Sequence, residues 1–187
     1  MNGRPAYSRT SPITPRLAGG SDAITTARIV YIVDDDPRVR RSLTNLLASF
    51  EISSRVFSSA LEYINSELPD IISCLILDLN LPDISGLALQ EKLATSQHPP
   101  IIFLTGHGDI SSSVQAMKAG AVDFLPKPFN KDHLLRSINE AFKCHAETRI
   151  IQAELAELSA RFSRLTPRER QVLPLIVAGH LNKQAAA

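Results

Sequence analysis

Short, unbroken apolar runs alternate with amphipathic stretches between residues 28 and 143. The runs are rich in β-branched and aromatic residues and are too short for helices, so they predict strands. Such strands are expected at 28–33, 74–79, 100–105 and 122–129, and the more polar stretch SSRVF at 53–57 is a further, short strand candidate. In the other stretches apolar residues recur every three or four positions, which predicts helices. These helices are expected at 37–50, 59–68, 85–94, 109–120 and 130–143.

The apolar runs lack the alternation of a half-exposed strand, so both faces of the sheet should be covered. Regular alternation of strand and helix is typical of a parallel sheet with crossover helices. The sequence therefore predicts an α/β domain with a five-stranded parallel, doubly wound sheet. Sheets of this class place their sites outside the carboxyl ends of the strands.

The segments on either side of this domain have a different character. Residues 1–27 are rich in Gly, Pro, Ser and Thr and predict a disordered leader. Residues 147–164 predict a helical linker that extends the last helix. Its apolar residues, continued by Leu165 just after the linker, are spaced 4-3-4-3. They are Ile151, Leu155, Leu158, Phe162 and Leu165. Such a seam can pair in a dimer or pack on the preceding domain, and the second arrangement is favoured.

Residues 165–187 form the start of a further helical unit. Thr166 and Glu169 have the spacing of a capping box, and Pro167 suits the first helical position. Gly179 is expected to end this helix and Asn182 to cap another. One and a half helices cannot bury a core of their own. We therefore expect this segment to be poorly packed or to borrow a surface from the preceding domain.

Composition narrows the function classes. The formal net charge is +1, so no overall field favours nucleic acid or a membrane surface. Cys74 and Cys144 are far apart in the sequence and are interpreted as reduced residues. No apolar run reaches the ~18 residues of a membrane span, and no secretory signal is present. These features predict a soluble cytoplasmic protein.

Polar side chains stand at four of the predicted strand ends. They are Asp34, Asp35 and Asp36, then Asp78, then Thr105, and finally Lys127. Asp36 followed by Pro37 is also a good helix N-terminus. A carboxylate that ends a buried strand beside other carboxylates needs neutralisation, and Mg²⁺ suits such a sparse oxygen site. Carboxylates, Mg²⁺, a hydroxyl and an ammonium together indicate phosphoryl transfer to an aspartate.

Four motifs carry a resemblance to a known family. They are "YIVDDDP", "LILDLNLPDISG", "IIFLTGHGD" and "AGAVDFLPKPF". In this order and spacing they resemble the receiver domain of two-component response regulators, over about residues 28–146. The chain looks most similar to FixJ-like members of the FixJ/NarL (LuxR-type) class, whose receiver precedes a helix-turn-helix domain.

The resemblance implies a flavodoxin-like receiver fold and a role for each site residue. Asp78 would be the phosphoacceptor and Lys127 the phosphate-binding ammonium. Thr105 and Phe124 would be the switch residues. The metal set would be Asp34, Asp35, Asp78 and the main-chain carbonyl of Asn80, holding Mg²⁺. A shift of the alignment by one residue would move the acidic pair to Asp35 and Asp36.

The resemblance also implies partners. A sensor histidine kinase would supply the phosphoryl group, and a phosphorylation-dependent homodimer could form on the fourth helix, with Val114 and Lys118 as contacts. Residues 165–187 resemble the first part of a LuxR-type DNA-binding domain without its reading helix, so specific promoter binding by this chain is not expected. A DNA-independent receiver is the alternative. A Mg²⁺-dependent phosphatase of the haloacid-dehalogenase type is disfavoured, because Asn80 stands where that family needs a second Asp.

Lys127–Pro128 is a candidate cis peptide.

Overall fold

A five-stranded parallel sheet, in the order β2-β1-β3-β4-β5, forms the centre of the computed structural model, which describes residues 27–106 and 110–177. The strands are β1 (Arg28–Val33), β2 (Ser53–Phe57), β3 (Ile72–Asp78), β4 (Ile101–Thr105) and β5 (Asp123–Pro126). The prediction of a doubly wound α/β fold is therefore confirmed, with each expected strand present.

Six helices follow or connect the strands within the described residues. They are α1 (Pro37–Ala48), α2 (Ala60–Ile64), α3 (Gly86–Leu93), α4 (Ile110–Lys118), α5 (Lys131–Ser163) and α6 (Pro167–Val177). The helix expected at 59–68 is shorter than predicted. It ends at Ile64, and Pro69 disfavours helical geometry at the residue before it.

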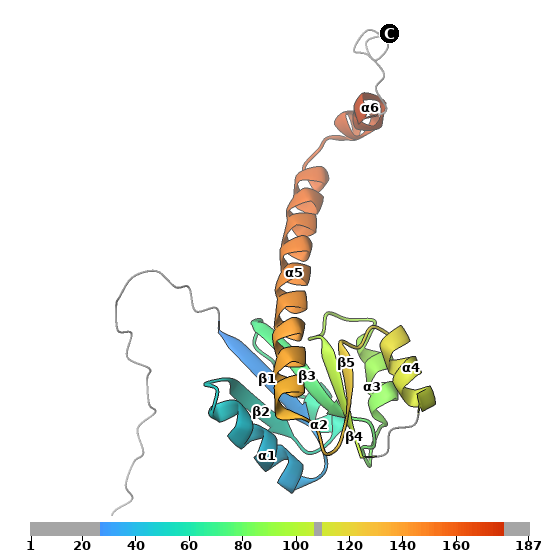
Figure 1. The fold of residues 1–187 in the computed structure, drawn as a ribbon. Helices are drawn as coiled ribbons and strands as arrows, with labels where there is room; N and C mark the ends of the chain where they lie inside the picture. Colours follow the sequence, from blue (N-terminus) through green and yellow to red (C-terminus); the bar gives the residue numbers. More distant parts are fainter. Residues whose placement is uncertain (1–26, 107–109, 178–187) are drawn as a thin grey trace, which may run out of the picture.

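The helices cover both faces of the sheet (Figure 1). Helices α1 and α5 cover one face, where their Leu43, Leu47, Leu134 and Ile138 pack on alternate residues of β1, β3 and β4. Helices α2, α3 and α4 cover the other face, around Tyr31, Leu75 and Phe103. Since strand side chains alternate between faces, continuous apolar strands supply both cores at once.

The strand register positions the functional edge. Val33, the last residue of β1, lies beside Leu77 of β3, and Asp78 lies beside Leu104 of β4. Asp34, which follows β1, and Asp78, which ends β3, therefore lie at the same level on neighbouring strands. Thr105, the last residue of β4, pairs with Pro126 of β5. Lys127 is the next residue after Pro126 and therefore lies just beyond the carboxyl ends of the strands. The sheet brings four segments that are distant in sequence to one end.

Local signals at the helix ends behave as expected. Asp36 and Asn130 cap α1 and α5 by accepting hydrogen bonds from the backbone N–H groups of Arg38 and His133. The Thr166 N–H donates to Glu169 at 2.7 Å, and the Glu169 N–H donates to the Thr166 hydroxyl at 3.3 Å, which confirms the capping box. The Lys127–Pro128 peptide is cis, as predicted.

Some expectations fall outside the described residues. These are residues 1–26 of the leader expected at 1–27, the first residue of the helix expected at 109–120, the Gly179 stop and the Asn182 cap. Among the helices that the structure describes, none combines the length and apolar character needed to cross a membrane.

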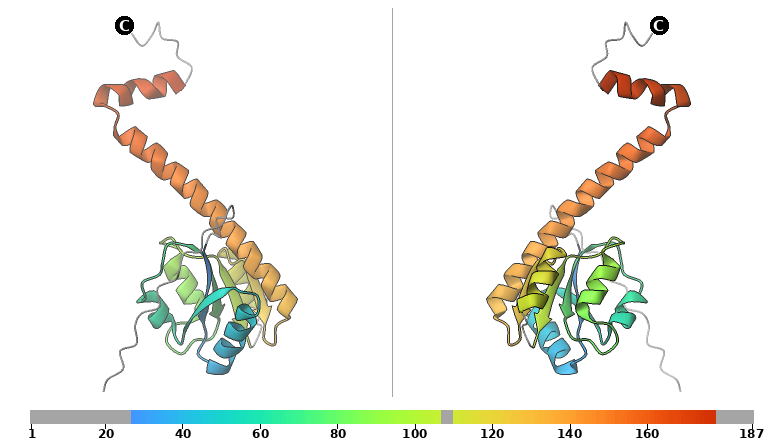
Figure 2. Two further views of the ribbon diagram at one scale, coloured as in Figure 1. Left: turned by 90° about the vertical axis from the view of Figure 1, so that its left-hand side faces the viewer. Right: turned by 90° about the vertical axis from the view of Figure 1, so that its right-hand side faces the viewer.

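Helix α5 agrees with expectation in its length but not in its packing. It is one helix of 33 residues, as a linker that extends the last helix requires, and its second half extends away from the sheet, with α6 at its far end (Figures 1 and 2). Ile151, Leu155, Leu158 and Phe162 are 51–60% exposed. The preferred prediction, that these residues pack on the preceding domain, is therefore wrong. The helix axis carries them past the end of the sheet, beyond the reach of its side chains.

His145 ties α5 to the opposite edge of the sheet from the acidic residues. Its Nδ1 atom lies 2.9 Å from the Ser73 backbone nitrogen, at a part of β3 that extends beyond the start of β4. Burial lowers the pKa of His145, and Arg149 and His98 act in the same direction, whereas Asp70 and the hydrogen bond to the Ser73 carbonyl oxygen, which also lies 2.9 Å from Nδ1, oppose them. Because burial outweighs the opposing effects, the neutral ring is the favoured form, and its Nδ1 accepts the Ser73 N–H.

Acidification should weaken this attachment. Because the pKa of His145 is lower in the folded protein, the unfolded chain binds more protons as pH falls below the ordinary histidine value of about 6.5. The contribution of His145 to stability is therefore complete above this pH and is lost below it. In urea titrations between about pH 5 and pH 7.5, His145→Gln should show a smaller loss of unfolding free energy on acidification than the wild type. Equal losses in both proteins would contradict this role.

Candidate functional site

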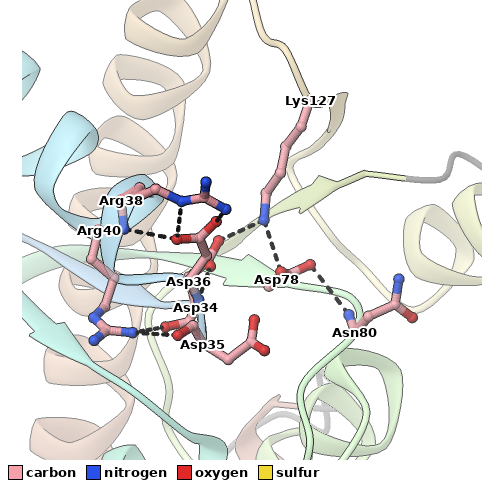
Figure 3. A network of polar contacts seen from close by, with 8 residues as sticks. All are labelled: Asp34, Asp35, Asp36, Arg38, Arg40, Asp78, Asn80 and Lys127. Carbon is pink, nitrogen blue, oxygen red and sulfur yellow. Dashed lines mark hydrogen bonds and ion pairs between the residues drawn. The ribbon is translucent and has the colours of Figure 1, made fainter.

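The loop after β1 holds three consecutive carboxylates in different environments (Figure 3). Asp34 is 1% exposed, and its Oδ1 accepts the Asp36 backbone N–H at 2.9 Å. The Asp36 side chain caps α1 and pairs with Arg38. Asp35 is exposed and turns toward Asp78. Because Asp36 is occupied at the helix end, Asp34 and Asp35 form the acidic pair that faces the sheet edge.

Lys127 joins two strand ends across the sheet. Its Nζ donates to Asp34 Oδ2 at 2.6 Å and to Asp78 Oδ2 at 2.7 Å (Figure 3). Both carboxylates are almost fully buried, and the lysine side chain is 18% exposed. The other Asp78 oxygen, Oδ1, accepts the Asn80 backbone N–H at 3.2 Å. The ammonium therefore partly neutralises a carboxylate cluster that would otherwise repel itself.

The electrostatics agree with this geometry. Burial raises the pKa of the Asp34 carboxyl above its ordinary value, although the hydrogen bond and charge of Lys127 oppose the increase. Burial also lowers the pKa of the Lys127 ammonium, but the hydrogen bonds and charges of Asp34 and Asp78 outweigh this effect and leave the pKa above its ordinary value. Lys127 is therefore a permanent positive charge at neutral pH.

Three carboxylates converge where the metal was expected. Oxygens of Asp34, Asp35 and Asp78 all lie within 4.8 Å of one another. A hard dication with oxygen ligands, such as Mg²⁺, fits this donor set and would offset its excess negative charge. Asn80 lies at the same edge, two residues after Asp78, with its side chain directed away from the carboxylates (Figure 3).

The two expected switch residues lie on neighbouring strands. Thr105 ends β4 and is fully buried, and its carbonyl oxygen accepts the Lys127 N–H at 2.6 Å. Phe124 is on β5 and is partly buried, with its ring centroid 6.1 Å from that of Phe103. A backbone hydrogen bond thus connects Thr105 to Lys127. Phe124 lies on the face of the sheet that α2, α3 and α4 cover.

Two contributors to the site were not identified from the sequence. Arg40 donates from one guanidinium nitrogen to the carbonyl oxygens of Asp34 and Asp35, at 2.6 and 3.0 Å, and so holds the acidic loop in place. Gly86, the first residue of α3, donates its N–H to the Leu79 carbonyl at 2.8 Å. A glycine at a helix start is unfavourable without a reason, which is the signal that could have drawn attention to it.

Gly86 has that reason in the backbone of Asp78. A Cβ atom at position 86 would lie 2.5 Å from the Asp78 carbonyl oxygen. Gly86→Ala should therefore force α3 or the end of β3 to move, destabilising the protein by about 2–3 kcal/mol and displacing Asp78. Thermal unfolding would measure the effect. Gly106→Ala is the matched control, since a Cβ there has no atom within 4 Å, and equal stability of the two variants would contradict the steric explanation.

Comparisons with known proteins agree with the site. A family model described as the response regulator receiver domain matches residues 30–139. Nodulation protein W of Bradyrhizobium diazoefficiens is 47% identical over 173 residues, which cover 92% of this chain and 76% of that protein. The transcriptional regulatory protein FixJ of the same organism is 38% identical, over 87% of this chain and 80% of that protein.

Solved structures give the same result. The response regulator StyR has a TM-score of 0.75 at 44% identity, over 86% of this chain and 81% of that chain. Full-length FixJ from B. japonicum has a TM-score of 0.61 at 37% identity, over 87% and 80% of the two chains. The family match and the FixJ-type relatives together show that the chain belongs to the response regulator receiver family and is a phosphorylation-dependent regulator of a two-component system.

Proposed function

We propose that Asp78 is the phosphoacceptor of this receiver. The observation that supports the proposal is the pairing of one Asp78 oxygen with Lys127 and of the other with the Asn80 backbone N–H, in a carboxylate that lies within the cluster formed with Asp34 and Asp35. In the reaction an Asp78 oxygen attacks phosphorus, and the bond from phosphorus to the donor breaks, with its electron pair leaving on the donor. Lys127 neutralises charge on the transferred oxygens, and Asp34 holds the lysine in position.

The remaining expected residues take supporting roles in this proposal. Asp34, Asp35, Asp78 and the Asn80 carbonyl would hold Mg²⁺, which would supply charge neutralisation for the phosphoryl oxygens. Thr105 donates its hydroxyl to a phosphoryl oxygen. Phe124 then moves toward the space that Thr105 leaves, and this movement changes the face formed by α4 and β5.

Receivers of this kind interact with sensor histidine kinases, and the FixJ-type relatives are transcription regulators. For this chain we propose a kinase as phosphoryl donor, a cytoplasmic location, and a phosphorylated dimer on the α4 face around Val114 and Lys118. Ile110 and Val114 on α4 are 79% and 47% exposed, which supports an interaction there. Specific promoter binding is not part of the proposal for residues 1–187.

The proposed organisation follows the sequence-based ranges. Residues 28–146 form the receiver, 147–164 the helical linker, and 165–187 the start of a LuxR-type helical unit, after a leader at 1–27. The linker range, except for its last residue Arg164, lies within the part of α5 that extends past the sheet. We propose no turnover of an external substrate, because the exposed Asn80 amide cannot serve as a general acid.

Incubation with acetyl phosphate tests the proposed chemistry. Acetyl phosphate replaces the kinase, so the chain should gain one phosphoryl group in Mg²⁺, and the gain should be lost when EDTA removes the metal. Intact-protein mass spectrometry measures the product. An absent or metal-independent phosphoprotein would refute the proposed site, and steady release of phosphate from a simple phosphate ester would instead favour a phosphatase.

A further inference from the structure

Helix α5 carries an apolar stripe that the described chain leaves largely exposed; Arg170 of α6, 5.7 Å from the centroid of the Phe162 ring, touches its far end. Its second half lies beyond the sheet, where Ile151, Leu155, Leu158 and Phe162 are 56%, 60%, 60% and 51% exposed. A protruding helix of this length is only marginally stable in water without packing on one face. A row of large apolar side chains of this kind marks an interaction surface.

The spacing of the stripe indicates what covers it. The exposed residues follow each other at intervals of 4-3-4-3-4, and we call this set the α5 seam. Its members are Cys144, Thr148, Ile151, Leu155, Leu158 and Phe162. Steps of four and three alternate, so the pattern repeats every seven residues, from Cys144 to Ile151 to Leu158 and from Thr148 to Leu155 to Phe162. This heptad is the repeat of two helices that supercoil around each other. A helix that packs on a globular surface has a wider stripe with a 3.6-residue period.

The receiver leaves the seam accessible to a partner. The side of α5 that faces the sheet is marked by Leu134, Ile138 and His145. On a helix of about 3.6 residues per turn, the seam points roughly a quarter turn away from that side. A second helix can therefore lie along the seam without displacing the receiver.

We infer that the α5 seam pairs with the same seam of a second copy of this chain, as a parallel two-stranded coiled coil. In a parallel pair each seam residue meets its own copy, so the overlap runs from Cys144 to Phe162. In an antiparallel pair centred on Leu155 and Leu158, Cys144 and Thr148 would face positions beyond the end of α5 at Ser163. An antiparallel pair with full overlap would instead set Phe162 against Cys144 and Leu158 against Thr148. Only the parallel pair combines full overlap with apolar residues that face apolar residues.

The residues beside the seam suit this arrangement. In a parallel coiled coil, the residue just before the first core position of each heptad, here Thr148 or Leu155, faces the residue five positions later on the partner helix. Glu147 then faces Gln152, and Glu154 faces Ser159, so each carboxylate meets a neutral hydrogen-bonding side chain. An antiparallel pair would instead bring Glu154 near Arg161, but Arg161 already donates to Glu157 of its own helix at 2.5 Å. No like charges meet across the parallel pair at these positions.

Cys144 makes the register testable. It is exposed at the receiver end of the seam, whereas Cys74 is fully buried. In the parallel pair the two Cys144 thiols face each other. Diamide should therefore oxidise them to one intermolecular disulfide, with both thiol protons and two electrons passing to the diamide. Cys144→Ser should abolish the cross-linked dimer on a non-reducing gel.

Sedimentation velocity on the unphosphorylated full chain tests the interface itself. The wild type should show a concentration-dependent monomer–dimer equilibrium, and the Leu155→Asp/Leu158→Asp variant should weaken it by about tenfold or more. Ala160→Asp, on the opposite side of the same helix, is the matched control and should dimerise like the wild type. Circular dichroism would verify equal helix content.

The outcomes separate this inference from the phosphoacceptor proposal. Asp78→Asn should still dimerise through the seam, and the seam variant should still accept a phosphoryl group. A wild type that stays monomeric at all concentrations would overturn the inference, as would a dimer that survives both Asp substitutions. A dimer that depends on the seam but forms no Cys144 disulfide would overturn the parallel register.

Discussion

Asp78→Asn should abolish phosphorylation of this chain by acetyl phosphate. The amide that replaces the carboxylate has no anionic oxygen to attack phosphorus, and no other described carboxylate has the same surroundings. Asp34 is directed to Lys127 and to the Asp36 N–H, and Asp36 is held by Arg38. We expect a loss of at least about 1,000-fold in the rate of phosphoprotein formation, because the nucleophile itself is removed.

Mass spectrometry after acetyl phosphate treatment would measure this loss, and Asp36→Asn is the matched control. That substitution alters the same cluster of acidic residues, but Asn is also a good helix cap. The control should therefore fold and accept a phosphoryl group. A phosphorylated Asp78→Asn protein would show that the acceptor is another residue.

Lys127→Met should reduce both stability and phosphorylation. The substitution leaves Asp34 and Asp78 buried without their shared cation, and these carboxylates are 1% and 6% exposed. Loss of one partner from such a site should destabilise the fold by about 2–3 kcal/mol, as judged by urea unfolding at neutral pH. Loss of a charge that stabilises the transferring oxygens should slow phosphorylation on the order of 100-fold.

The two effects can be separated by a variant and by metal. Lys127→Arg keeps the positive charge and should recover more stability than phosphorylation, because the guanidinium cannot reproduce the single-point contact to both carboxylates. Added Mg²⁺ should stabilise Lys127→Met, since a dication can offset the uncompensated carboxylates. If Lys127→Met without Mg²⁺ unfolded at the same urea concentration as the wild type, Lys127 would not neutralise the two carboxylates. Lys131→Met, at the exposed start of α5, is the control for loss of a lysine.

Most of the secondary structure could be predicted from the sequence. The five strands lie within one or two residues of the expected positions at most ends. For the strands inside the sheet this follows because continuous apolar runs indicate burial on both faces, whereas β2 (SSRVF) has no such run and is buried only at Phe57. β5 ends three residues before the expected limit. The first residues of α1 and α5 follow from the caps that Asp36 and Asn130 supply. The helix at α2 was overestimated because its periodic pattern continues past Ile64 into a segment that ends at Pro69.

The residues of the candidate site were also apparent from their positions at strand ends, although their chemical roles stay predictions. Their contacts were not apparent. Lys127 bridges partners that lie 93 and 49 residues earlier in the chain, and this depends on the strand order. Arg40 and Gly86 were not predicted from the sequence. Arg40 binds backbone carbonyl groups, which every residue has, and Gly86 matters because it has no side chain.

The sequence by itself determined the elements, the parallel α/β class and the polar residues at the strand ends, because these depend on short-range periodicity and on residue chemistry. Tertiary structure alone decided that Asp34 rather than Asp36 joins Asp78 and Lys127, and that Gly86 must lie against the Asp78 backbone. It also decided that the second half of α5 leaves its apolar stripe exposed. A stripe of apolar residues shows that a helix face needs a partner, but only the direction of the helix axis shows whether its own domain can supply one.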